Sequence, residues 1–199
     1  ENKIEFLSLH TSYIMNRMEP LAERMRPHTL DEYVGQSHLV GKNAILRNMI
    51  ESGHVPSFIL WGPPGVGKTT LAQIIANKLE TPFYTLSAIA SGVKDVRNVI
   101  ERAKNGRFFN SISPILFIDE IHRFSKSQQD SLLGAVEKGI VTLIGATTEN
   151  LHRGTRAWNV CSMFCSVCRM TMRCLAMSWS WDATALLLLL AEMAFLSFK

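Results

Sequence analysis

Residues 62–69 read Gly62-Pro63-Pro64-Gly65-Val66-Gly67-Lys68-Thr69 and fit the pattern G-x-x-x-x-G-K-[ST]. The apolar run at 58–61 before them predicts a buried strand, and residues 68–79 after them predict a helix. A strand, a glycine-rich loop and a helix in this order form the context that a phosphate-binding P-loop requires. The alternative is a glycine-rich turn that binds nothing, and the complete pattern in its proper context argues against it.

The residue types explain how such a loop binds phosphate. Glycines at 62, 65 and 67 let the backbone turn sharply, so that its N–H groups point at phosphate oxygens. The helix that begins at the loop directs its positive dipole end at the same oxygens. Lys68 supplies a cation for the β- and γ-phosphates, and the Thr69 hydroxyl is placed to ligate Mg²⁺. The sequence therefore predicts a nucleotide site with a magnesium ion.

A second motif adds hydrolysis. Residues 115–120 are Ile-Leu-Phe-Ile-Asp-Glu, and four apolar residues in a row suit a strand buried on both faces of a parallel sheet. Its carboxyl end would lie in the crevice where open α/β sheets bind ligands. We expect Asp119 to hold the Mg²⁺ shell and Glu120 to polarise the attacking water. The alternative is a strand that ends in surface acids. His122 is interpreted as a strand-to-helix junction residue rather than a metal ligand.

A third apolar strand ends in polar residues. The run at 141–146 is followed by Thr147-Thr148-Glu149-Asn150. A polar side chain at this strand end is placed to touch the γ-phosphate or the attacking water, and a simple turn is the alternative.

The hydrophobic pattern alternates between helices and strands. Predicted helices cover residues 43–52, 68–79, 93–105 and 126–138, and predicted strands cover 58–61, 83–86, 115–118 and 140–145. This alternation indicates an α/β fold with a parallel sheet covered on both faces. A chain of 199 residues with 47 % hydrophobic content is long enough for one sizeable core.

The three motifs in this order resemble an AAA+ ATPase of the clamp-loader branch: GPPGVGKTT, ILFIDEIHRF and LIGATTEN. Flanking segments at 20–27, 30–36, 59–62, 86–88 and 91–97 are similar to the replication-associated recombination protein A family. That family (the RarA/MgsA type) is related to the Werner-helicase-interacting ATPase. The resemblance runs from about Glu19 to Asn150, and it implies a P-loop AAA+ three-layer sandwich.

The resemblance also implies a role for each matching residue. The adenine-packing segment would contain Arg26, Pro27, Val34 and Gly35. The phosphate-binding positions would be Gly62, Pro63, Pro64, Gly65, Val66, Gly67, Lys68, Thr69 and Thr70.

The remaining implied roles concern catalysis and DNA. Asp119 and Glu120 would be the Walker B pair that works with Lys68, and Thr148 aligns with the sensor-1 position. The helix opened by residues 92–97 lies near the central channel in relatives, which makes Lys94 and Arg97 candidate DNA contacts. Their alternative interpretation is a solvated helix face.

For function, the resemblance implies a DNA-dependent AAA+ ATPase that uses ATP and Mg²⁺ in replication fork maintenance and recombination. The expected partners are single-stranded or forked DNA, replication proteins and further copies of the chain in a ring. The expected location is cytoplasmic and nucleoid-associated. Alternatives are a nucleotide-binding fragment without turnover, and a clamp-loader subunit or branch-migration motor. Trp61 and the run at 91–97 favour the family named above.

The composition changes after Asn150. Residues 1–150 carry 16 Lys and Arg against 15 Asp and Glu, whereas residues 151–199 carry five against two. The sequence pI of about 9.0 therefore comes mostly from this tail and does not indicate a nucleic-acid footprint. All the cysteines also lie in the tail, so a disulfide framework for the body is excluded. The spacing of Cys161, Cys165, Cys168 and Cys174 is not that of two C-x₂-C pairs, so a zinc site is not favoured.

The tail lacks the segments that the resemblance implies. No Pro-Ser-Phe start or Ser-Arg pair follows Asn150, and no motif makes Arg153 or Arg156 an arginine finger. Neither a final edge strand beside the P-loop strand nor a helical lid is recognisable, so we expect one side of that strand to be unpaired. We also expect weak hydrolysis by this chain alone, because losing such an arginine costs on the order of 10³-fold or more.

We therefore divide the chain into an N-terminal extension at 1–18, an AAA+ core at 19–150 and an atypical tail at 151–199. The extension is interpreted as non-native, with Met15 or Met18 as the native start and the residues before it as vector or upstream translation. The tail is interpreted as a frameshifted or wrongly joined coding end, or a truncated gene model, that is poorly ordered. A genuinely evolved tail is the alternative. No signal peptide is apparent, and the apolar run at 183–198 contains Glu192 and is short for a membrane helix.

Overall fold

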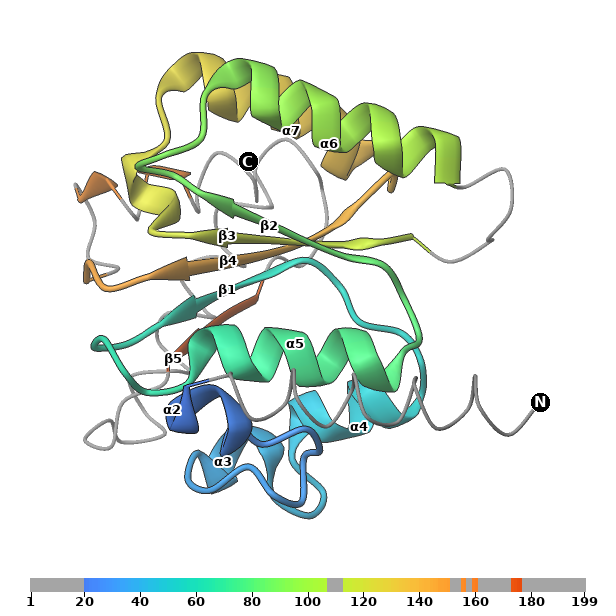
Figure 1. Cartoon of the computed structure of the whole chain (residues 1–199), viewed down its shortest axis with the longest axis vertical. Coiled ribbons are helices and arrows are strands. Elements are labelled where there is room, and N and C mark those ends of the chain that lie inside the picture. The colour runs from blue at the N-terminus through green and yellow to red at the C-terminus, as the bar shows by residue number, and fades with distance from the viewer. Residues whose placement is uncertain (1–19, 107–112, 151–154, 157–158, 161–172, 177–199) are drawn as a thin grey trace, which may run out of the picture.

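A computed structural model describes residues 20–106, 113–150, 155–156, 159–160 and 173–176 of the chain. One parallel sheet lies between two layers of helices, as Figure 1 shows. Its strand order is β2-β3-β4-β1-β5. The predicted α/β class with a parallel, three-layer arrangement is therefore confirmed.

The strands of this sheet are β1 (Phe58–Trp61), β2 (Phe83–Ser87), β3 (Ile115–Asp119), β4 (Thr142–Thr147) and β5 (Arg173–Ala176). The helices within the described residues are α2 (Leu21–Arg24), α3 (Ser37–Val40), α4 (Ile45–Glu51), α5 (Lys68–Lys78), α6 (Val93–Gly106), the short 3₁₀ helix η1 (Ile121–Arg123) and α7 (Lys126–Glu137). Sequence patterns anticipated α4 to α7 and β1 to β4, but not the short α2, α3 and η1.

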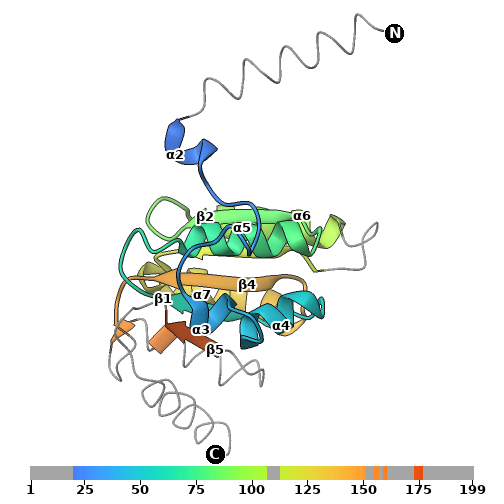
Figure 2. The same ribbon diagram turned by 90° about the horizontal axis from the view of Figure 1, so that it is seen from below.

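The strands bury side chains on both faces, which explains their continuous apolar runs. In β1, Ile59 and Trp61 join the core beneath α6 and α7, whereas Phe58 and Leu60 join the core beneath α3, α4 and α5. Figure 1 shows these two helical layers on opposite sides of the sheet. Figure 2 shows α2 standing away from the layers, and this helix has no buried residue.

Strand β4 starts two residues later than its apolar run predicts. Gly139 adopts a left-handed φ of 60° after α7, and its N–H donates to the Val136 carbonyl oxygen at 3.0 Å. The Ile140 N–H donates to the Ala135 carbonyl oxygen at 2.8 Å, which completes a Schellman ending. Ile140 therefore caps the helix before it can pair in the sheet.

Strand β5 corrects the expectation that the P-loop strand has no partner on one side. Its residues pair in parallel with all of β1, from Phe58 opposite Arg173 to Trp61 opposite Ala176. A four-residue edge strand needs only backbone pairing, and the run Arg-Cys-Leu-Ala has no alternation that would mark it. The final edge strand is thus present at Arg173–Ala176, where no sequence pattern predicted it.

No helix within the described ranges is long and apolar enough to cross a membrane. The predicted N-terminal extension at 1–18 and the apolar run at 183–198 lie outside those ranges.

Candidate active site

The residues predicted for phosphate binding and catalysis meet at the carboxyl edge of the sheet. Ile59 of β1 and Ile118 of β3 are both in register with Gly145 of β4, so these three strands end side by side. The Gly62 N–H donates to the Thr147 carbonyl oxygen at 3.2 Å and extends the pairing of β1 with β4 by one step. The P-loop, the carboxylate pair and the threonine pair therefore emerge at one edge.

The P-loop adopts the left-handed backbone that its glycines allow. Gly65 has φ 79° and Gly67 has φ 86°, and α5 begins at the next residue. A Cβ atom added to Gly67 would lie 2.8 Å from the hydroxyl oxygen of Tyr33. Glycine is therefore required at position 67 both for its backbone angle and for the approach of this side chain.

Tyr33 connects the segment at 30–36 to the P-loop. Its hydroxyl donates to the Val66 carbonyl oxygen at 3.0 Å, and the ring is buried. Burial raises the pKa of Tyr33 to about 12, so the group remains a donor at physiological pH. Sequence reasoning gave Tyr33 no role of its own, because 33 residues separate it from the carbonyl that it contacts.

Lys68 is held by the loop in which it lies. Its side chain is buried, with 7 % of the residue exposed, and Nζ donates to the carbonyl oxygens of Gly62 and Pro63, both at 2.8 Å. Burial lowers the pKa of Lys68, and the Glu120 and Asp119 carboxylates partly oppose this shift. The P-loop cation and the carboxylate pair therefore share one electrostatic environment.

Two exposed oxygen donors stand at this edge. Thr69 lies in the first turn of α5, and the Asp119 carboxylate lies at the end of β3, where Oδ1 accepts from the Glu120 N–H at 3.0 Å. Hydroxyl and carboxylate oxygens are hard ligands that suit Mg²⁺. Among the described residues, no group of three or more His, Cys, Asp and Glu could hold a metal by itself. That donor set fits Mg²⁺, which keeps water and phosphate ligands.

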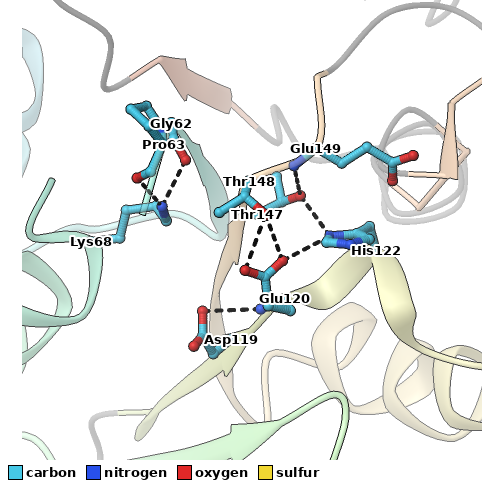
Figure 3. A network of polar contacts seen from close by, with 9 residues as sticks. All are labelled: Gly62, Pro63, Lys68, Asp119, Glu120, His122, Thr147, Thr148 and Glu149. Carbon is cyan, nitrogen blue, oxygen red and sulfur yellow. Dashed lines mark hydrogen bonds and ion pairs between the residues drawn. The ribbon is translucent and has the colours of Figure 1, made fainter. Parts of the chain in front are cut away.

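The Glu120 side chain lies in a network of polar contacts, drawn in Figure 3. Its backbone is left-handed, with φ 52°, a strained conformation for a residue with a side chain. The Thr148 hydroxyl contacts both carboxylate oxygens, at 2.9 and 3.1 Å. His122 Nδ1 lies 3.2 Å from Glu120 Oε2 and 2.8 Å from Thr147 Oγ1. The Glu149 N–H donates to the same Thr147 oxygen at 3.1 Å.

The structure gives His122 contacts in addition to its interpreted place as a junction residue. It does lie at the junction, in η1 directly after β3, but its ring faces Glu120 and Thr147. The contact of His122 with Glu120 could have been predicted from the sequence, because a turn after Glu120 brings the residue two positions later near its carboxylate. No sequence pattern indicated the contact with Thr147, which comes from another strand.

The residues implied for adenine lie on the N-terminal side of α3. Arg26 forms an ion pair with Glu23 at 2.7 Å, next to the partly buried Pro27. Val34 is 94 % exposed, and Gly35 is left-handed with φ 91°. The neighbouring Tyr33 contacts the P-loop, so the segment at 33–35 is fixed beside the loop.

The candidate DNA residues lie in α6, in the helical layer across the sheet from α5 (Figure 1). Lys94 and Arg97 are exposed, whereas Val96 and Ile100 face the core. Arg97 lines a shallow groove that also contains Glu101, Lys104 and Asp130. The two carboxylates reduce the positive potential of that groove.

The remaining candidates fall mainly outside the described residues. These are Arg153, Cys161, Cys165 and Cys168, while Cys174 is described only as part of the β5 backbone. Arg156 is exposed.

The chain is similar to known proteins over most of its length. The P-loop domain of the Holliday junction DNA helicase RuvB matches residues 25–153. A replication-associated recombination protein A from Haemophilus influenzae is 53 % identical over 135 residues, which cover 68 % of this chain and 30 % of that protein. The protein of the same name from Coxiella burnetii is 57 % identical over the same shares.

Two further similarities extend the comparison. The ATPase WRNIP1 of Dictyostelium discoideum is 51 % identical over 150 residues, covering 75 % of this chain and 17 % of that protein. The RuvB Holliday junction branch migration motor of Thermotoga maritima superimposes with a TM-score of 0.54 at 29 % identity, covering 85 % of this chain and 53 % of that one. The chain thus spans about 30 % of the length of the replication-associated recombination proteins A from Haemophilus influenzae and Coxiella burnetii.

Proposed function

The chain belongs to the RuvB P-loop domain family and, over about residues 19–150, to the replication-associated recombination protein A family of AAA+ ATPases, and we propose that it binds ATP with Mg²⁺ at its P-loop. The observation that carries this proposal is the buried Lys68, which the carbonyls of Gly62 and Pro63 fix at the start of α5. A desolvated ammonium in a loop of left-handed glycines is a site prepared for an anion.

Each residue of the site has a proposed task in binding. The loop from Gly62 to Thr70 holds the phosphates, through Lys68 and the N–H groups from Gly65 to Thr70, and the segment containing Arg26, Pro27, Val34 and Gly35 packs around adenine. Thr69 and Asp119 provide the protein ligands of the metal. When bound, Mg²⁺ would neutralise charge on the phosphate oxygens.

The proposed tasks in hydrolysis fall to the network at the ends of β3 and β4. Glu120 polarises the attacking water, and Thr148 orients the Glu120 carboxylate through the contacts at 2.9 and 3.1 Å. A general base must first lie within hydrogen-bond reach of the water that it activates. The Glu120 carboxylate is oriented by contacts from residues at the ends of β3 and β4, which favours a prepared site over a pair of surface acids.

The wider function proposed is that of a DNA-associated ATPase in replication fork maintenance and recombination. The relatives at 50 to 57 % identity carry names that refer to replication-associated recombination. DNA contact through Lys94 and Arg97, assembly into a ring, replication proteins as partners and a nucleoid-associated location belong to the same proposal. A nucleotide-binding unit without turnover is the second candidate. Arg156 is an exposed arginine after Asn150, but no sequence motif marks it as an arginine finger.

Two measurements test the proposal on the full chain. Binding of a fluorescent ATP analogue should require Mg²⁺ for full affinity and should be lost in Lys68→Ala, with Lys78→Ala at the exposed end of α5 as the matched control. Equal affinity in both variants would contradict the proposed site. ATP turnover should then be measured with and without forked DNA. A DNA-stimulated rate supports the ATPase, and binding without turnover supports the second candidate.

A further inference from the structure

The contacts of His122 extend beyond the tasks assigned above. We propose that His122 is a positioning residue for Glu120, whose Nδ1–H, shared between the Glu120 carboxylate and the Thr147 hydroxyl, fixes the plane of that carboxylate. The inference rests on the proposed function, because that function gives Glu120 the task of polarising water.

The first step concerns the proton on the imidazole. A carboxylate oxygen only accepts, so the 3.2 Å approach of His122 Nδ1 to Glu120 Oε2 is attractive when Nδ1 carries hydrogen. In the other neutral tautomer, two lone pairs would face each other at that distance. The His122 side chain is only 10 % exposed, so water cannot readily replace this bond. The contact with the carboxylate therefore favours the Nδ1–H tautomer, in which the Thr147 hydroxyl oxygen at 2.8 Å can also accept.

The second step concerns the anchor. Thr147 is fully buried, and its backbone carbonyl accepts from the Gly62 N–H at the start of the P-loop. Its hydroxyl oxygen accepts from the Glu149 N–H and lies 2.8 Å from His122 Nδ1. The imidazole is thus attached to a residue that β4 and the P-loop both hold in place. Its position relative to the phosphate loop is fixed through that residue.

The third step explains why Thr148 is not sufficient. A hydroxyl has a single hydrogen, and the Thr148 hydroxyl lies between the two Glu120 oxygens at nearly equal distances. This contact alone leaves the carboxylate plane poorly defined, because the terminal torsion of glutamate is broad. His122 contacts Oε2 specifically, and the second point of attachment fixes the rotation. Catalytic groups need orientation within roughly 10–20° to be productive.

The variants can separate this role from simple packing. His122→Asn places an amide nitrogen near the position of Nδ1, whereas His122→Gln places it one bond farther, near Nε2. We expect His122→Gln to lower kcat by about 10- to 100-fold with KM nearly unchanged, and His122→Asn to recover most of the loss. Equal turnover of His122→Gln and the parent chain would overturn the inference. A matching rise in KM for both variants would also overturn it.

A spectroscopic test on the full chain does not depend on turnover. The chain is labelled with ¹⁵N-histidine, and the His122 signals are assigned by their absence in His122→Asn. We expect the Nδ1–H tautomer in the parent chain and a loss of that preference in Glu120→Leu, which removes the accepting carboxylate. An Nε2–H tautomer in the parent chain would overturn the proposal.

The coupling of His122 to Glu120 provides a second test without turnover. His122→Leu and Glu120→Leu together should lower the midpoint of denaturant unfolding by less than the sum of their separate effects. Additive effects would overturn the proposed contact. If the tautomer and the coupling are as expected but no variant or parent turns over ATP, the positioning contact is supported and the proposed hydrolysis fails.

Discussion

Two charged side chains at the same edge of the sheet are held in different ways. Lys68 is held by two backbone carbonyls of its own loop, five and six residues away. Glu120 is held by the side chains of His122 and Thr148, the second of which lies 28 residues away, directly after strand β4. The lysine position is thus specified by a local motif. The carboxylate position depends on the register between β3 and β4, and a side-chain substitution can change it without moving the backbone.

The largest effect on ATP turnover is expected when Glu120 loses its ability to take up a proton but keeps its contacts. Glu120→Gln keeps an oxygen acceptor for Thr148 but cannot take up a proton, so turnover should fall by about 10²- to 10⁴-fold. ATP affinity should change little, because binding depends on the P-loop. Steady-state hydrolysis measures the turnover, and equilibrium nucleotide binding measures the affinity. Glu137→Gln at the exposed end of α7 is the control. Loss of binding in Glu120→Gln would show that the two regions are not separable.

The second effect acts on the other side of the comparison. Lys68→Met removes the cation while keeping most of its aliphatic volume, and the cost of losing a buried charge contact is about 2–5 kcal/mol. We therefore expect nucleotide affinity to fall by at least about 30-fold. Isothermal titration of ATP with Mg²⁺ measures this, with Lys78→Met as the matched control. An affinity within a few fold of the parent chain would contradict a backbone-held cation as the centre of phosphate binding.

The third prediction tests whether the P-loop depends on its backbone. Gly67→Ala introduces a Cβ atom at φ 86° and 2.8 Å from the Tyr33 hydroxyl, so the free energy of unfolding should fall by about 1–3 kcal/mol. Gly134→Ala in α7 meets no atom within 4 Å and should be neutral or stabilising by up to about 1 kcal/mol. Denaturant unfolding of both variants measures the contrast. A stable Gly67→Ala chain would show that the loop conformation is not fixed by this glycine.

The smallest effect expected is a dependence on pH. Burial lowers the pKa of Lys68, so this group loses its proton at a lower pH than an ordinary lysine. Affinity for ATP should therefore be complete while Lys68 is protonated and decline as the pH rises through its lowered pKa. Proton uptake should accompany binding in that range, which titration in buffers of different ionisation enthalpy detects. The same profile in Lys68→Met would assign the dependence to another group.

The sequence predicted the parts of the site that depend on local patterns. The glycine spacing at 62–67 located the loop, and apolar runs located β1 and β3 almost to the residue. The Gly139 ending of α7 displaced the start of β4, because capping and strand pairing compete for the same backbone N–H. The contact of His122 with Thr147 was not predictable from local sequence, since it depends on tertiary packing.

The tail shows a different limit. Strand β5 joins the sheet by parallel pairing with β1, at the edge where it has a single neighbour. Backbone pairing leaves little trace in side-chain patterns over four residues. The short helices α2 and α3 were also not predicted, because one turn of helix is too short to show a hydrophobic period.

The strand order has a consequence for folding during synthesis on the ribosome. Strand β1 is the first of the five strands to be synthesised, yet its neighbours in the sheet are β4 and β5, the last two. The four residues of β1, which are buried in the folded chain, therefore have no sheet partner until the intervening polypeptide has been synthesised. Strands β2 and β3 are available to pair first. Vectorial synthesis thus makes completion of the P-loop strand a late step, and an apolar segment that waits for distant partners is a natural target for chaperones.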